Sequence, residues 1–313
     1  MQLRRVKRLP SGRVFAVALM AIAAWPAGAQ KRATQEVPAF RADSTLVLVP
    51  VTVVDRRGSI VSGLASDAFM LTEDGVRQHI RSFSEEDAPV SMGIVLDLSG
   101  SMKGVLGSAR ESLRALMKDA NPADEAFLNA VSTSPRAYSG FTDHFDELLH
   151  KVAFEDAGGN TALIDTIYGS LDQLRSGVHN RRALLVISDG MDNHSRYSRE
   201  ELLRRAVESD AQIYTIAVGN FSPYAKPMTL MEERRGLLFL DELAAKTGGI
   251  SFIVHSPTDI AAAAASIGQA LRNQYTIGYV PRGNDRNGQW RRIRVRVADS
   301  GLRAYARTGY RPD

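Results

Sequence analysis

Five oxygen-bearing side chains, from three separate segments, carry the chemistry that this sequence offers. They are Asp97, Ser99 and Ser101 in SMGIVLDLSGSM (91–102), Thr161 in AGGNTALID (157–165) and Asp189 in ALLVISDG (183–190). Hard divalent cations take oxygen ligands, and Mg²⁺ is typically held by one or two carboxylates while it keeps other positions open. The set therefore predicts a half-open site for Mg²⁺ or Mn²⁺.

Two of these segments are apolar runs that end abruptly in the oxygen-bearing residues. An open α/β sheet gathers its ligand-binding groups in loops at the carboxyl ends of parallel strands. Neutral hydroxyls would hold the ion without cancelling its charge, and Gly100 and Gly190 would relieve crowding where the backbone turns near it. Taken singly, each of the five residues is explained as a turn or helix cap; their combination indicates a metal site.

The elements that must position these side chains alternate between strand and helix from about residue 90. Strands are expected at 92–98, 126–132, 183–189, 212–219 and 250–256, and helices at 103–118, 142–152, 161–176, 199–208, 237–247 and 258–272. Apolar strands that alternate with helices are typical of a mostly parallel sheet covered on both faces. We therefore predict a doubly wound α/β domain over residues 89–273.

Strand-like segments flank this domain on both sides. They are 45–54, 68–72 and 76–83 before it, and 275–281, 290–298 and 302–310 after it. The turn Glu73-Asp74-Gly75 predicts a hairpin. We expect the N-terminal segment 45–88 and the C-terminal segment 274–313 to pack together as a smaller β-sandwich into which the α/β domain is inserted. Two independent β patches are the alternative.

Residues 1–29 have the pattern of a signal peptide. A basic region precedes an apolar stretch from Val14 to Trp25, and Ala27-Gly28-Ala29 provides the small residues of a cleavage site. The stretch is shorter than the roughly twenty residues that a spanning helix needs, and no later run is long enough for a transmembrane segment. We expect an exported protein, periplasmic or secreted, with a polar linker at 30–44.

Charge and cysteine content exclude other classes of protein. The sequence has 39 basic and 35 acidic side chains, and five of the basic ones fall in the expected signal peptide, which leaves 34 against 35. This balance argues against a nucleic-acid partner. The chain has no cysteine, which excludes disulfides and a lipid anchor attached to cysteine.

The segments around the candidate site resemble the von Willebrand factor type A (VWFA) domain, specifically the exported bacterial group of VWFA-related proteins. The domain resemblance covers about 90–272, and the group's pattern extends over about 40–310 through EDGVRQHIRSF (73–83) and RNQYTIGYVP (272–281). The family's metal-ion-dependent adhesion site consists of D-x-S-x-S, a Thr and an Asp, and the five residues above match it. The resemblance implies that the domain binds a partner protein through an exposed Glu or Asp that completes the coordination of the metal.

Two other functions stay open: a structural envelope module whose metal only braces the loops, and a metal-dependent hydrolase. The hydrolase is the less expected. The sequence contains no H-E-x-x-H, no G-x-S-x-G and no phosphate-binding loop, and of its six histidines only His194 lies near the metal loops in sequence. We therefore predict a binding module and no enzyme.

Three weaker features each have a plain structural explanation. The tripeptide Asp192–His194 either rims the metal site or forms a polar loop, which is the simpler reading. The segment Phe221–Arg235 is expected to be a surface loop, with a binding rim as the alternative. Arg292, Arg294 and Arg296 alternate with apolar residues, so strand geometry alone explains one solvated basic face, and an anion site is the alternative.

Overall fold

The computed structural model describes residues 46–118, 120–153, 155–219, 227–281 and 288–312. The expected signal peptide and linker lie outside the described residues. The described residues belong to one compact unit. In the part of the chain that is described, no helix combines the length and apolar character needed to cross a bilayer.

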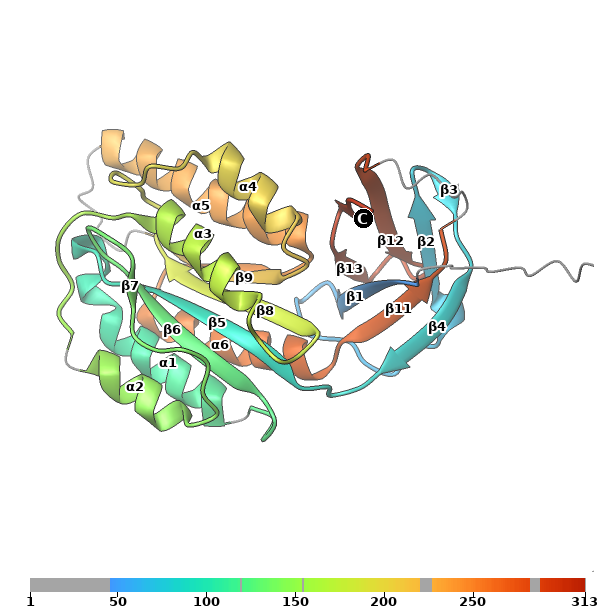
Figure 1. Ribbon diagram of the computed structural model, residues 1–313, viewed down its shortest axis with the longest axis horizontal. Coiled ribbons are helices and arrows are strands. Elements are labelled where there is room, and N and C mark those ends of the chain that lie inside the picture. The colour runs from blue at the N-terminus through green and yellow to red at the C-terminus, as the bar shows by residue number, and fades with distance from the viewer. Residues whose placement is uncertain (1–45, 119, 154, 220–226, 282–287, 313) are drawn as a thin grey trace, which may run out of the picture. The chain divides into compact units, whose positions relative to one another are not determined.

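A six-stranded sheet forms the centre of the α/β domain (Figure 1). Its strand order is β10-β9-β8-β5-β6-β7, and every neighbouring pair is parallel except β6 with β7. The strands are β5 (Val90–Asp97), β6 (Glu125–Val131), β7 (Arg136–Ala137), β8 (Arg181–Ser188), β9 (Gln212–Val218) and β10 (Ser251–Val254). All residues of β5 and β9 are buried, as in strands covered on both faces. The predicted doubly wound architecture is confirmed.

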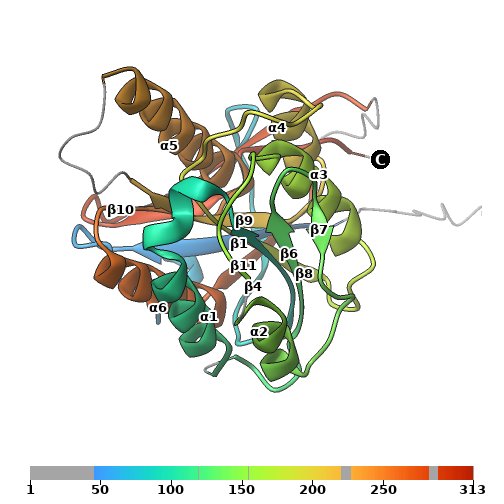
Figure 2. The same cartoon turned by 90° about the vertical axis from the view of Figure 1, so that its left-hand side faces the viewer.

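Helices cover both faces of this sheet (Figures 1 and 2). Apolar side chains of α1, α2 and α6 join the core on one face, and those of α3, α4 and α5 join the core on the other. The helices are α1 (Leu106–Lys118), α2 (Phe145–Ala153), α3 (Leu163–Leu174), α4 (Arg199–Val207), α5 (Pro227–Thr247) and α6 (Pro257–Arg272), and the 3₁₀ turn η2 (Gly100–Gly104) precedes α1.

Helix α5 is longer than the sequence predicts. The prediction begins this helix at residue 237 and treats Phe221–Arg235 as a loop, whereas the helix begins at Pro227. Proline is favoured at the first helical position because its missing N–H is not needed there. A glycine within a helical pattern lowers the expectation of a helix, but Gly236 has a packing reason, since it lies against the backbone of Gly190. Residues 221–226 lie outside the described part.

The two ends of the chain form two four-stranded antiparallel sheets. Their orders are β13-β1-β11-β4 and β14-β12-β2-β3, so each sheet combines N-terminal and C-terminal strands. The strands are β1 (Val47–Val54), β2 (Phe69–Glu73), β3 (Val76–Arg77), β4 (Ile80–Glu85), β11 (Tyr275–Tyr279), β12 (Arg291–Val297), β13 (Arg303–Ala306) and β14 (Gly309–Tyr310), and the 3₁₀ turn η1 (Ser66–Ala68) precedes β2. Val49 and Val51 of one sheet share a core with Phe69 and Leu71 of the other. The predicted β-sandwich is confirmed.

Two predicted strands are each divided. Segment 76–83 becomes β3 and β4, which belong to different sheets, and segment 302–310 becomes β13 and β14, which also lie in different sheets. The predicted hairpin joins β2 to β3, and its turn residues Asp74 and Gly75 have φ angles of 48° and 84°, typical of a type I′ turn. The alternating pattern does not show where a strand passes from one sheet to the other, because both pieces remain strand-like.

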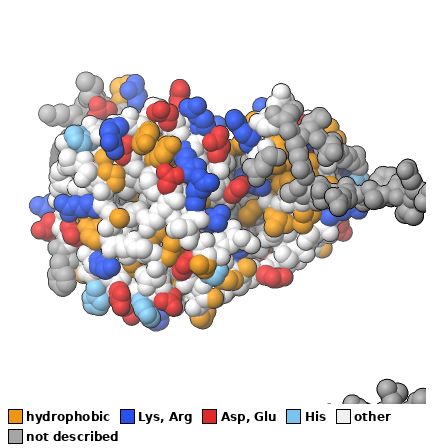
Figure 3. Space-filling model, viewed as in Figure 1, with side chains coloured by type: hydrophobic (Ala, Val, Ile, Leu, Met, Phe, Trp, Pro, Cys, Tyr) orange, Lys and Arg blue, Asp and Glu red, His pale blue; other side chains and the backbone are white. Residues whose placement is uncertain are grey.

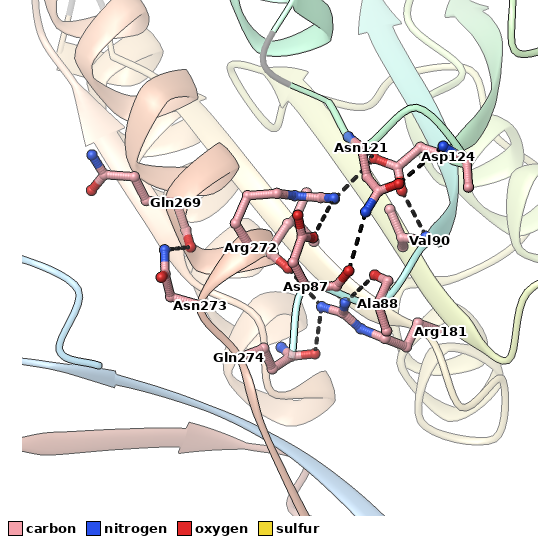
Figure 4. Close-up of polar contacts among 12 residues, drawn as sticks. Asp87, Ala88, Val90, Asn121, Asp124, Arg181, Gln269, Arg272, Asn273 and Gln274 are labelled. Carbon is pink, nitrogen blue, oxygen red and sulfur yellow. Dashed lines mark hydrogen bonds and ion pairs between the residues drawn. The ribbon is translucent and has the colours of Figure 1, made fainter. Parts of the chain in front are cut away.

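Two connections join the sandwich to the α/β domain, one between β4 and β5 and one between α6 and β11 (Figure 4). Arg272, at the end of α6, pairs with Asp87 at 2.6 Å and with Asp124 at 2.9 Å. Arg181, at the start of β8, donates a hydrogen bond to the carbonyl oxygen of Ala88. Both connections are therefore fixed next to the amino ends of β5 and β8, the opposite ends of these strands from the candidate metal site.

Candidate metal centre

The carboxyl ends of β5 and β8 place Asp97 and Asp189 on neighbouring strands. The two strands are parallel and in register from the pair Val90–Arg181 to the pair Leu96–Ile187. Asp97 is fully buried and Asp189 is 7% exposed. From β5 the chain continues to β6 on one side of it, whereas β8 lies on its other side. This is the switch point of the sheet, where open α/β folds bind ligands.

Short hydrogen bonds orient the carboxylate of Asp97. The backbone N–H of Ser99 donates to Oδ1 at 2.8 Å, and the hydroxyl of Ser188 donates to Oδ2 at 2.6 Å. The same Ser188 oxygen accepts a bond from the backbone N–H of Gly190 at 3.0 Å. Ser188 thus links the ends of β5 and β8, a role that the sequence analysis missed; its only signal was a hydroxyl directly before Asp189.

The two serines of the D-x-S-x-S segment lie on the loop between β5 and η2. Ser99 is buried at the N-cap of η2, and Ser101 is exposed in its first residues. Their hydroxyl oxygens are 3.1 Å apart. The two hydroxyls therefore face the same side of the loop, and Ser101 is the more exposed of the two serines.

Thr161 is held by the loop that follows Asp189. Its backbone N–H donates to the side-chain oxygen of Asn193 at 2.9 Å, and its carbonyl accepts from the N–H groups of Asn193 and His194, each at 3.1 Å. Upstream, the N–H of Gly158 donates to the carbonyl of Leu98 at 2.7 Å. The Thr161 segment is therefore fixed to the end of β5 on one side and to the Asp189 loop on the other.

Asp192 has a structural part in the same loop. Its Oδ2 accepts from the N–H of Ile164 at 3.0 Å, in the first turn of α3, and its carboxylate also accepts from the backbone and hydroxyl of Ser195. Carboxylates at a helix start satisfy backbone donors that have no partner within the helix. Asp192 and Asn193 hold the loops together by these bonds.

Asp97 and Asp189 differ from three other buried carboxylates, each of which has a paired arginine. Glu73 pairs with Arg291 at 2.7 Å, Asp124 with Arg272 at 2.9 Å, and Asp165 with Arg196 at 3.3 Å. Among the described residues, no lysine or arginine forms an ion pair with Asp97 or Asp189. Burial raises the pKa of Asp97 to about 6, the bonds from Ser188 and Ser99 oppose this rise, and the charge of Asp189 adds to it.

These observations fit a divalent cation. Burying a carboxylate without a counter-charge is costly, and two neighbouring aspartates with added hydroxyls supply the hard oxygen ligands that Mg²⁺ and Mn²⁺ take. The described residues contain no group of three or more His, Cys, Asp or Glu side chains suited to a metal. The candidate ligands are therefore two carboxylates and three hydroxyls, and they belong to Asp97, Ser99, Ser101, Thr161 and Asp189.

The loop after β8 packs tightly on helix α5. Gly190 has a φ of 74°, and a Cβ atom placed on it would lie 2.4 Å from the carbonyl carbon of Gly236. A Cβ placed on Gly236 would lie 2.7 Å from the carbonyl oxygen of Asp189. Backbone contact this close requires glycine at both positions, and it makes α5 a direct support of the metal loop.

Comparison with known proteins matches part of this chain to a known domain family. Residues 92–191 match the family model of the von Willebrand factor type A domain. Among solved structures, BatB from Bacteroides thetaiotaomicron is 20% identical over 58% of this chain and 98% of that chain, with a TM-score of 0.46. The vWF domain of the type V pili tip protein Mfa5 from Porphyromonas gingivalis is 13% identical over 58% and 95%, with a TM-score of 0.46.

The pilus adhesin SpaC from Lactobacillus rhamnosus GG, in an open conformation, is 8% identical over 80% of this chain and 48% of that chain, with a TM-score of 0.50. A search of curated proteins gives no significant match. The family model covers all five candidate ligands, from Asp97 to Asp189. This chain therefore contains a von Willebrand factor type A domain, matched over residues 92–191.

Proposed function

We propose that this protein is an exported, metal-dependent protein-binding module. A Mg²⁺ or Mn²⁺ ion bound by Asp97, Ser99, Ser101, Thr161 and Asp189 would capture an exposed Glu or Asp of a partner protein. The observation that carries this proposal is the pair of buried aspartates to which no described residue supplies a positive charge.

Each residue has a defined part in the proposal. Asp97 and Asp189 provide the negative charge, while the hydroxyls of Ser99, Ser101 and Thr161 add neutral oxygen ligands. The bound ion would supply a positive, electrophilic centre for a partner's carboxylate. Ser188 and the backbone of Ser99 fix the direction of the Asp97 carboxylate, and Asn193 fixes the backbone of Thr161.

A binding role agrees better with the site than catalysis does. A hydrolase needs a general base positioned near the metal. His194 is the histidine nearest the site in sequence, and it is bonded to Thr161 through its backbone N–H. SpaC, which shares the fold, is a pilus adhesin, and export is proposed from the pattern of residues 1–29. We therefore propose no catalytic step.

Calorimetric titration of Mg²⁺ and Mn²⁺ into the chelator-treated protein tests the metal site. We expect saturable binding at one site, loss of that binding in Asp189→Ala, and unchanged binding in Asp143→Ala, which removes an exposed carboxylate from the loop before α2. Equal binding by wild type and Asp189→Ala would contradict the site. The titration is then repeated with a peptide that contains Glu and with its Gln counterpart.

The peptide arm separates capture from bracing. If the metal captures an acidic partner, the Glu peptide raises the apparent affinity for the metal and the Gln peptide does not. If the metal only braces the loops, neither peptide has an effect, and Asp97→Ala unfolds the domain. Capture predicts instead that Asp97→Ala keeps the fold and loses metal-dependent binding of the peptide.

A further inference from the structure

A cavity of about 790 Å³ lies where helices α4 and α5 face strands β12 and β13. None of the five proposed metal ligands lines it. The helix side carries both signs of charge: its ionisable residues are Glu200, Arg204, Glu208, Glu242 and Lys246. Figure 3 shows Lys and Arg side chains interspersed with Asp and Glu over this part of the surface. The cavity is large enough for a ligand of several residues or for a small molecule.

The strand side carries one sign of charge only. It contains five arginines and no carboxylate, and the arginines are Arg292, Arg294, Arg303, Arg307 and Arg311. Arg307 pairs with Asp210, and Arg311 lies 3.9 Å from Glu208. The other three form no ion pair with any residue that the structure describes. Three arginines of this wall therefore have no paired carboxylate among the described residues.

Both strands of this wall present an open edge. β13 is the outermost strand of its sheet, and no described strand pairs with its outer edge up to Tyr305; directly after β13, Arg307 pairs with Thr247 at the end of α5. β12 pairs with β14 only at Arg291 and Arg292, so from Arg294 onward its second edge has no strand neighbour in the described structure. Open edges expose backbone N–H and C=O groups that another extended chain can pair with.

We propose that this cavity binds an extended peptide segment that carries acidic side chains at alternate positions. Residues two apart in a strand are spaced by about 7 Å, so Arg292 and Arg294 present their charges with the spacing of alternate side chains of an added strand. The intervening side chains of the peptide would lie on the opposite face of the added strand, the face to which Ile293 and Val295 belong on β12, and this favours apolar groups there. Backbone pairing with an open edge and charge pairing with the arginines would act together.

A peptide fits these features better than a single small anion does. One phosphate or sulfate would use neither the open strand edges nor more than a few of the arginines, which come from β12, β13 and the residues after β13. Trp290, which is 39% exposed and lines the cavity, adds an aromatic surface that suits the apolar parts of a peptide. This site would act without the metal and so does not depend on the function proposed above.

The test uses a fluorescently labelled peptide in which Glu alternates with Val and Thr, added to the full chain in excess chelator. We expect saturable binding, retained in Asp97→Asn, and weakened at least tenfold in Arg292→Glu and in Arg294→Glu, because repulsion replaces attraction. Arg296→Glu is the matched control: it is an equal change of charge on the same strand and the same face, but Arg296 does not line the cavity. Peptide binding should also change the fluorescence of Trp290 in a Trp25→Phe background, where it is the only tryptophan.

Three outcomes would overturn the proposal. Equal weakening by Arg296→Glu would show general attraction to a basic surface and no defined site. Displacement of the peptide by low concentrations of inorganic phosphate would identify a small-anion site. Unchanged affinity for a peptide methylated on alternate backbone nitrogens would exclude pairing with a strand edge. Each of these results is independent of whether the metal site binds Mg²⁺.

Discussion

Two buried carboxylates, one in each part of the molecule, meet opposite surroundings. Glu73 in the β-sandwich is 3% exposed. It pairs with Arg291 at 2.7 Å and accepts hydrogen bonds from the hydroxyls of Tyr279 and Tyr310. Asp97 in the α/β domain is fully buried, and it accepts bonds from the Ser99 backbone and the Ser188 hydroxyl. The sandwich thus neutralises its buried charge internally, whereas the edge of the α/β domain does not.

This difference separates a structural use of charge from a binding use. A buried ion pair keeps its charge balanced only while both partners are present. A buried carboxylate that is held only by neutral hydrogen-bond donors keeps its orientation, and its uncompensated charge favours the binding of a cation. We therefore expect the sandwich to be sensitive to loss of its own cation, and the α/β domain to be sensitive to the metal in solution.

The largest expected effect comes from removing the internal cation of the sandwich. Arg291→Met leaves Glu73 buried without its counter-charge, and loss of one partner of a buried pair typically lowers the free energy of unfolding by about 3 kcal/mol or more. Urea denaturation in the presence of a chelator measures this loss. Arg296→Met, on an exposed position of the same strand, should change the free energy of unfolding by less than about 0.5 kcal/mol. Equal stability of the two variants would show that Glu73 does not need Arg291.

The second effect is the stabilisation of the α/β domain by Mg²⁺. At a concentration one hundred times the dissociation constant, the ion should raise the free energy of unfolding of the wild-type protein by about 2.7 kcal/mol. Asp97→Asn should abolish this gain. Without metal, Asp97→Asn should be at least as stable as the wild type, because it removes a buried charge while an amide can still bond to Ser99 and Ser188. A large loss of stability in the metal-free variant would show that the charge of Asp97 is balanced within the protein.

The part of the candidate site that the sequence predicts consists of residues at the ends of strands. Asp97 and Asp189 each terminate an apolar run, and parallel strands bring such ends to one edge, so their proximity was predictable. The supports of Thr161 were not, because Asn193 lies 32 residues away along the chain and no local pattern pairs the two. Ser188 was missed for a similar reason, since its partner Asp97 lies on a neighbouring strand.

For the fold, too, the sequence predicted local patterns but not features that depend on tertiary contacts. Periodicity predicted the order of strands and helices in the α/β domain. The pairing of the two terminal segments in one sandwich was expected because strands that are distant in sequence can share a sheet. Periodicity did not predict the division of 76–83 between two sheets, because a strand that changes sheets keeps its alternation. Periodicity also placed the start of α5 too late in the chain. Gly236 lowered the expectation of a helix there, and its packing against Gly190 is visible only in the tertiary structure.

The third prediction tests whether α5 supports the metal loop. Gly236→Ala should lower the free energy of unfolding by about 2 kcal/mol, since overpacking forces the backbone to shift, and it should weaken Mg²⁺ binding because the new methyl group meets the carbonyl oxygen of Asp189. Gly169→Ala, in α3, is the control: no atom lies within 4 Å of its added Cβ, so it should stabilise the helix by about 0.5–1 kcal/mol. Thermal unfolding and calorimetric titration of both variants measure the two effects. Unchanged Mg²⁺ affinity in a destabilised Gly236→Ala would limit α5 to a packing role.

The smallest effect, and the sharpest test of the comparison, is expected for Ser101→Ala. Ser101 is exposed, and its hydroxyl lies 3.1 Å from that of Ser99, so its loss should leave the stability of the metal-free protein within about 0.5 kcal/mol of the wild type. If the hydroxyl is a metal ligand, Mg²⁺ affinity should fall about tenfold, which equals about 1.4 kcal/mol. Ser62→Ala, at an exposed serine of the sandwich, should change neither quantity. If Ser101→Ala loses stability without metal and keeps its Mg²⁺ affinity, the role of Ser101 is structural, like that of Glu73, and the hydroxyl is not a metal ligand.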